Sequence, residues 1–193
     1  MLFRTQLFVA ILLVAAISLL APQVLAKSDI GLKGIGAKVG YLMPEDPLDA
    51  TFTFGAVADL GTFIPELHWD ASVQYWSTGY KQSSWDWSWS DIAIKSTVRY
   101  LFPIEGGIKP YVGGGLGIHL YRSEWDFPSY QLYGMTVPGG SSSASDTEFG
   151  FHIVGGAEFK LAPKWKLQTE LEYGSADLDQ FAIVANFIYA LGK

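Results

Sequence analysis

The sequence predicts an all-β protein whose eight antiparallel strands form an up-and-down barrel. Eight stretches alternate apolar residues with small, polar or charged ones, which is the period of a strand with two unlike faces. The connections between them are short at one end and longer at the other, as in a meander that crosses a bilayer. After residue 26 the sequence has no helical period of useful length, and no stretch approaches the roughly 18 apolar residues of a membrane helix.

The first 26 residues have the features of a secretory signal peptide. Arg4 gives a positive start, residues 7–20 form an apolar run too short to span a bilayer, and residues 24–26 form a small-x-small cleavage site. An uncleaved N-terminal anchor is the alternative. We therefore expect a signal peptide at 1–26 and one barrel domain at 27–193.

The composition excludes several classes of function. The chain has no cysteine, which excludes disulfides, thiol catalysis and thiolate metal sites. Its formal net charge is −6, with 19 acidic against 13 basic residues, and it lacks the basic patch that nucleic acid requires. We therefore expect no nucleic-acid partner.

The eight strands repeat one two-sided pattern. Their expected ranges are 33–43, 51–61, 67–77, 90–102, 110–121, 148–161, 164–174 and 179–191. One face of each strand is apolar, as shown in chain order by Tyr41, Phe54, Val73, Ile94, Leu116, Phe151, Leu171 and Ile183. The other face is polar or small, as shown in the same order by Lys38, Thr53, Gln74, Lys95, Gly115, His152, Glu170 and Asn186.

The connections alternate in length along the chain. Those after the second, fourth and sixth strands are short and hold Pro or Gly: "TFIPE", "PIEGGIK" and "APK". Those after the third and fifth strands are expected to be long loops, "STGYKQSSWDWSWS" and the segment from Arg122 to Thr147. An even number of strands leaves both termini at the short-turn, periplasmic end, so the long loops project outside the cell.

The alternation alone does not decide which face meets water, because a secreted lipocalin-like barrel with an apolar interior has the same period. The polar face carries five bases and five acids although the chain is acidic. Such a balance suits a closed lumen, because an unpaired buried ion costs several kcal/mol. The predicted lumen ion-pair network consists of Lys38, Asp59, Asp70, Lys95, Arg99, Glu158, Lys160, Lys166, Glu170 and Glu172.

Two further observations favour an apolar face that meets lipid. Glycines share the polar face with the long charged side chains and leave room for them in a lumen of eight strands, although glycine also permits bends. Aromatic residues end the apolar tracks, as Trp165 and Tyr173 do, about 27 Å apart along their strand. This spacing is close to the lipid-facing band with its aromatic girdles.

With these features, residues 27–193 resemble the small bacterial outer-membrane barrels of the OmpA transmembrane-domain and OmpX type, the outer membrane protein β-barrel domain family. The resemblance implies outer-membrane lipid, including lipopolysaccharide, and the barrel assembly machinery as partners. The C-terminal stretch "FAIVANFIYALGK" has the alternation of the family's assembly signal, but it ends in Gly192-Lys193 instead of an aromatic residue.

Neither the histidines nor the strand carboxylates form a catalytic motif. His68, His119 and His152 fall on the polar faces of different strands, where an interior hydrogen-bond network is the simplest role. A lipid A-modifying enzyme with a His–Ser pair is the alternative, with Ser72 or Ser123 as the serine, but no GxSxG spacing accompanies them. We expect no catalytic, cofactor or metal site.

The two long loops are the candidates for binding at the cell surface. The stretch "SSWDWSWSD" alternates three tryptophans with polar residues, and aromatic side chains of this kind bind carbohydrate or a protein partner. Its simpler interpretation is an extension of the fourth strand with a Trp-rich outer girdle. The candidate binding residues are Trp85, Trp87, Trp89, Trp125 and Tyr130.

The sequence thus predicts an eight-stranded antiparallel transmembrane β-barrel in the bacterial outer membrane. We expect a structural or surface-interaction role, such as adhesion or recognition, with a charge-filled lumen that does not conduct. A lipid A-modifying enzyme and a small pore are the alternatives.

Overall fold

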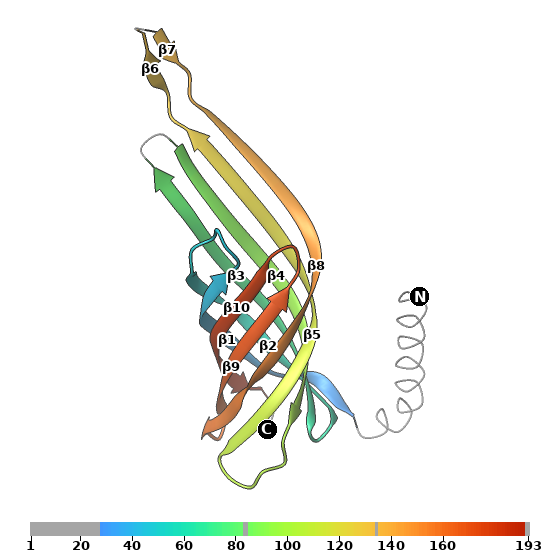
Figure 1. The fold of residues 1–193 in the computed structure, drawn as a ribbon. Helices are drawn as coiled ribbons and strands as arrows, with labels where there is room; N and C mark the ends of the chain where they lie inside the picture. Colours follow the sequence, from blue (N-terminus) through green and yellow to red (C-terminus); the bar gives the residue numbers. More distant parts are fainter. Residues whose placement is uncertain (1–27, 83–84, 134, 192–193) are drawn as a thin grey trace, which may run out of the picture.

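The computed structural model describes residues 28–82, 85–133 and 135–191, and the predicted signal peptide lies outside them. Eight strands close into an antiparallel barrel in the order β1-β10-β9-β8-β5-β4-β3-β2 (Figure 1). Their bounds are β1 Asp29–Pro44, β2 Thr51–Ile64, β3 Leu67–Gln82, β4 Trp85–Leu101, β5 Ile108–Phe127, β8 Gly140–Ala162, β9 Trp165–Ser175 and β10 Asp179–Ala190. Because β10 pairs with β1, the predicted up-and-down barrel is confirmed.

Four strands continue past the barrel and form a blade, drawn in the upper part of Figure 1. The blade consists of residues 77–82 of β3, 85–90 of β4, 122–127 of β5 and 140–145 of β8. A two-stranded hairpin lies at its tip, made of β6 (Tyr130–Leu132) and β7 (Met135–Val137).

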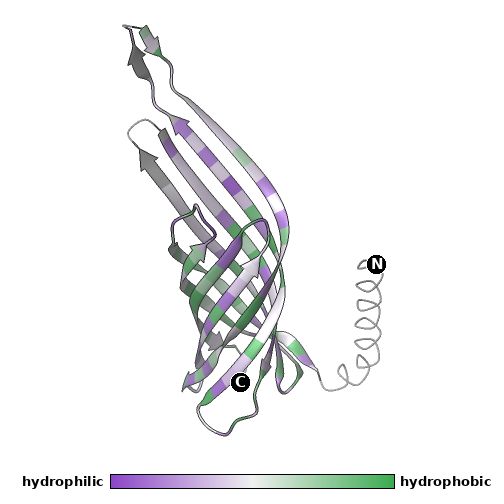
Figure 2. Ribbon diagram, in the orientation of Figure 1, coloured by the Kyte–Doolittle hydropathy of each residue, from purple (hydrophilic) through white to green (hydrophobic). Residues whose placement is uncertain are grey.

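The two predicted long loops are therefore mostly strands, and the simpler interpretation of the tryptophan-rich stretch as an extension of the fourth strand is confirmed. The pairing of β3 with β4 continues to Gln82 and Trp85, and that of β5 with β8 continues to Phe127 and Gly140. Serine-rich and glycine-containing stretches predict loops, but backbone pairing with a neighbouring strand stabilises them here as strands. In Figure 2 the blade is mostly purple to white, whereas the barrel strands alternate with green.

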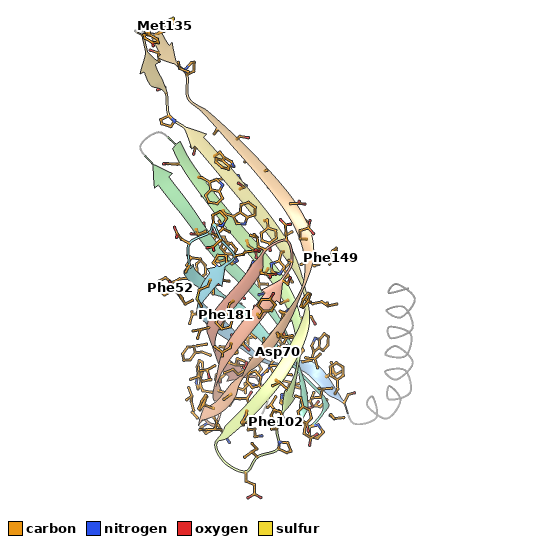
Figure 3. All side chains as sticks on the ribbon, viewed as in Figure 1. Phe52, Asp70, Phe102, Met135, Phe149 and Phe181 are labelled. Atoms are coloured by element: carbon orange, nitrogen blue, oxygen red, sulfur yellow. The ribbon has the colours of Figure 1, made fainter. Side chains whose placement is uncertain are left out.

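Side-chain burial shows that the barrel is polar inside and apolar outside. Lys38 and Arg99 are buried, whereas 75% of Phe52 and 79% of Phe149 is exposed. Figure 3 shows Phe52, Phe149 and Phe181 on the outer side of the strands. A soluble barrel buries its apolar face, so this arrangement excludes the lipocalin-like alternative. Among the described residues no helix is long and apolar enough to cross a membrane.

The aromatic residues form two belts on the outer surface. At the short-turn end, the Trp165 and Tyr189 ring centroids lie 5.1 Å apart. At the opposite end, Tyr41 packs on Phe52 with centroids 5.5 Å apart. Tyr173 also lies at this end, where it is the strand partner of Phe181. Such belts lie at the two lipid–water interfaces of outer-membrane barrels.

The inward glycines have two separate reasons to be glycine. A Cβ on Gly117 would meet Lys95 Cγ at 3.2 Å, so this glycine leaves room for a long side chain, as predicted. A Cβ on Gly115 would lie closer than 3.0 Å to the carbonyl oxygen of Ser96 on the neighbouring strand, a separation that real Cβ atoms essentially never show. Gly115 is therefore required by the close approach of two strands in a narrow barrel.

Candidate functional site

The middle of the lumen holds a compact cluster of two lysines and two glutamates. Lys38 Nζ lies 2.9 Å from Glu172 Oε2 and 3.4 Å from Glu170 Oε1. Lys95 forms an ion pair with the other oxygen of Glu172 and donates a hydrogen bond to Gln74 Oε1 at 3.1 Å. Because all four charged side chains are buried, the two positive and two negative charges neutralise one another inside the barrel.

A second charged cluster lies nearer the short-turn end. Lys166 Nζ is 2.6 Å from Asp59 Oδ2 and 3.5 Å from Glu158 Oε2. The Arg99 guanidinium pairs with Asp70, which Figure 3 labels, and its Cζ lies 4.8 Å from the centroid of the Tyr111 ring. Charged side chains therefore continue along the lumen from the lysine–glutamate cluster toward the short turns.

Lys160 does not join the predicted network. It is exposed at the short-turn end of β8, and it makes no ion pair with any residue that the structure describes. The expected balance of five bases and five acids is therefore wrong: four of the bases and the five acids form ion pairs in the lumen, and the buried Asp91 adds a sixth acid to the described interior. Alternation placed Lys160 on the correct face, but it does not show where the lumen opens to water.

Neutral side chains supply further hydrogen bonds to the buried acids. Tyr111 Oη donates to Glu170 at 3.0 Å, and Asn186 Nδ2 donates to the same carboxylate at 2.9 Å. Gln168 Nε2 donates to Glu158 at 3.0 Å. The predicted network omitted these residues. Their positions on the polar faces of their strands could have identified them.

The space left between the two clusters is small. A cavity of about 10 Å³ is bordered by residues of both clusters, including Lys38, Asp70, Arg99 and Glu170. This volume is about what a single water molecule occupies. The two clusters are therefore closely packed against each other.

The three histidines are held separately. His119 Nδ1 lies 2.8 Å from Asp91 Oδ2, and His152 Nε2 lies 2.8 Å from Thr97 Oγ1. His68 Nε2 lies 3.2 Å from the carbonyl oxygen of residue 65, at the short-turn end. Within the described parts of the chain, no three His, Asp or Glu side chains gather as a metal site would require.

An apolar cap covers the outer end of the lumen. Its buried members are Leu42, Leu48, Trp76, Tyr121, Ala182 and Val184. Trp87 and Trp89 pack against this cap from the blade. The cap was not predicted, because Leu48 comes from a connection and Trp76 from the face predicted to be polar.

The blade tryptophans face inward, so the predicted outer girdle is wrong. Trp87, Trp89 and the buried Asp91 occupy every second position of β4, so their side chains point to the same face of the strand. The lipid-facing residues of β4 occupy the positions between them. The Trp87 and Trp125 ring centroids are 5.6 Å apart, and those of Trp89 and Tyr121 are 5.9 Å apart. Because the Trp87 and Trp89 ring centroids are 6.3 Å apart, the four rings form a continuous array in which Tyr121 is buried, and we call this array the aromatic surface.

The other two candidate binding residues are placed only by their backbone. Trp85 begins β4 and Tyr130 begins β6, and their side chains lie outside what the structure describes. Both strands belong to the long-loop end, as predicted.

The pattern that defines the outer membrane protein β-barrel domain matches residues 10–189. The chain belongs to this family. Its outer-membrane location follows from the membership and agrees with the apolar outer wall. No curated protein matches the chain in sequence.

Solved outer-membrane barrels share the fold. A major outer membrane protein of Thermus thermophilus is 9% identical, with a TM-score of 0.56 over 82% of this chain and 99% of that chain. OprG of Pseudomonas aeruginosa is 10% identical, with a TM-score of 0.55 over 85% and 98%. Neisserial surface protein A is 19% identical, with a TM-score of 0.54 over 81% and 95%.

Proposed function

We propose that this outer-membrane barrel is a non-conducting anchor that presents a recognition blade outside the cell. The aromatic surface is the observation that carries the proposal. It brings neighbouring aromatic rings together at the long-loop end of the barrel, and 40% of Trp125 is exposed. One barrel of the same fold is itself named a surface protein, which agrees with this role.

The filled lumen supports an anchor rather than a pore. The lumen is filled along the barrel axis by ion pairs, by neutral hydrogen-bond donors and, at the outer end, by the apolar cap. A hydrated ion that crossed this barrel would have to break buried ion pairs, and each loss of a partner costs several kcal/mol.

The aromatic rings indicate the class of ligand. We propose a carbohydrate, because aromatic rings stack on the apolar faces of sugars. The carboxylates of Asp86, Glu124 and Asp126 border a depression of about 450 Å³ on the opposite face of the blade, because these residues alternate with the tryptophans along their strands.

Replacing Trp87 and Trp125 by alanine is expected to weaken ligand binding while the barrel still folds. The measurement is binding of the protein in lipid nanodiscs to an array of immobilised polysaccharides, with heat-modifiable gel mobility as the folding control. Each lost aromatic contact is worth about 1 kcal/mol, so the double variant should bind roughly thirtyfold more weakly.

The matched control is Trp165→Phe, which alters a tryptophan at the opposite end of the barrel. It should leave binding to the array unchanged. Equal binding by the wild type and the Trp87→Ala/Trp125→Ala variant would contradict the assignment of the aromatic surface.

We also propose that the protein is not an enzyme. His119 is buried beside Asp91, and the Ser123 hydroxyl accepts a hydrogen bond from Trp87 Nε1 at 3.2 Å instead of facing a histidine. Incubation with labelled lipid A should therefore leave its acyl chains intact. Acyl transfer or deacylation that disappears in His119→Ala would overturn this proposal.

A further inference from the structure

Four buried polar atoms in the lumen have no hydrogen-bond partner among the residues that the structure describes, and their side chains border the same cavity. They are Asp70 Oδ1, Arg99 Nη1, Arg99 Nη2 and Asn186 Oδ1. All three side chains are more than nine-tenths buried, with 1% of Arg99, 3% of Asn186 and 5% of Asp70 exposed. Because an unsatisfied buried donor or acceptor is destabilising, these atoms together indicate a ligand that pairs with them.

The hydrogen bonds of the three side chains identify each unpaired atom as a donor or an acceptor. Asn186 Nδ2 donates to Glu170 Oε1 at 2.9 Å, so the amide oxygen is the atom left as an acceptor. Arg99 Nε donates to Asp70 Oδ2, which leaves Asp70 Oδ1 as a second acceptor and the two Nη groups as donors. Arg99 Nη1 lies 4.0 Å from Glu158 Oε2, which is beyond hydrogen-bond distance.

The charges around the cavity disfavour an ion as the ligand. Two bases, Lys38 and Arg99, border it together with two acids, Asp70 and Glu170. A cation would lie beside the two bases, and an anion would lie beside the two carboxylates. The unpaired donors and acceptors therefore favour a neutral molecule that both donates and accepts hydrogen bonds.

The size of the cavity limits the ligand to one water molecule. Its volume of about 10 Å³ is close to the smallest that holds a water, and a buried water makes about three hydrogen bonds. We propose that the cavity binds one water molecule, which accepts a hydrogen bond from the Arg99 guanidinium and donates to Asp70 Oδ1 and Asn186 Oδ1.

The bound water joins the two charged clusters of the lumen. Arg99 and Asp70 belong to the cluster nearer the short turns, whereas Asn186 donates to Glu170 of the lysine–glutamate cluster. Through the water, the two clusters become one hydrogen-bonded network. The water does not depend on the recognition blade or on its ligand, so the failure of this proposal and the failure of the proposed function are separate results.

A high-resolution crystal structure of the refolded barrel tests the proposal. We expect a single water peak within hydrogen-bond distance of Arg99, Asp70 and Asn186. A cavity without a peak in a well-ordered lumen would overturn the proposal.

The ligand class is tested by refolding and crystallising the protein in sodium bromide or in rubidium chloride. Neither ion is expected to give an anomalous peak in the cavity. A bromide peak there would assign the site to an anion, and a rubidium peak would assign it to a cation. Either result would overturn the proposal.

Two substitutions of Val57, a buried residue that borders the cavity, test its size. Val57→Ile adds a methylene group that fills the cavity, so the water peak should be lost. Val57→Ala enlarges the cavity and should add a second water beside the first. A water peak that persists unchanged in Val57→Ile would contradict the placement of the site.

The matched control is Val154→Ile, which adds the same methylene group at a buried position. Val154 packs with Leu101 and Tyr111 and does not border the cavity. The water peak should persist in this variant. Its loss in Val154→Ile as well would mean that any added volume in the lumen expels the water, and would contradict a site defined by Arg99, Asp70 and Asn186.

Discussion

Glu172→Gln is expected to lower the free energy of unfolding of the barrel by about 3–5 kcal/mol, because it removes the shared partner of two buried ammonium groups. Lys38 would keep Glu170 at 3.4 Å, whereas Lys95 would keep only the amide oxygen of Gln74. Urea unfolding of the protein in lipid vesicles, followed by tryptophan fluorescence, measures this change.

A compensating variant separates charge imbalance from loss of packing. Glu172→Gln/Lys95→Met restores neutrality in the lysine–glutamate cluster, so it should be more stable than Glu172→Gln alone. The control Asp29→Asn breaks the exposed ion pair between Asp29 and Lys33, and it should lower the free energy of unfolding by less than about 1 kcal/mol. If Glu172→Gln lowered the free energy of unfolding by no more than Asp29→Asn does, the buried cluster would not contribute to stability as described.

Gly115→Ala is expected to prevent the barrel from closing. The new methyl group would clash with the carbonyl oxygen of Ser96, so β4 and β5 would have to move apart along their shared ladder. Overpacking of this kind costs about 3 kcal/mol or more. The expected result is loss of the heat-modifiable gel band that marks a folded barrel.

Gly155→Ala is the matched control for this prediction. Gly155 lies on β8, and nothing lies within 4 Å of a Cβ placed on it. The folded band should therefore persist in Gly155→Ala. Equal loss of the band in both variants would mean that glycine acts through general strand flexibility and not through the approach of Gly115 to Ser96.

The strands and their two faces were predictable because side-chain alternation is a local property. Lys38 and Glu172 lie on the predicted inner face, and Phe54 and Leu171 lie on the predicted outer face. The pairing partners were predictable only in outline. An up-and-down order places consecutive strands side by side, but it does not fix which lysine reaches which glutamate.

The rest depends on the closed three-dimensional structure. Apart from the extension of the fourth strand, the blade was predicted as loops, because the partners that stabilise the serine-rich segment of β8 are distant in sequence. The inward direction of Trp87 and Trp89 follows once β4 is known to be continuous from Trp85. The exposure of Lys160 depends on where the short turns end, which the alternation does not encode.

Planar-bilayer recording tests the central claim, that buried ion pairs and an apolar cap close the lumen, most directly. The purified wild-type barrel should insert without discrete current steps, because the space between its charged clusters is about that of one water molecule. Insertion is checked independently by the heat-modifiable band of protein recovered from the same lipid. Reproducible steps of uniform conductance from the wild-type protein would contradict the closed lumen.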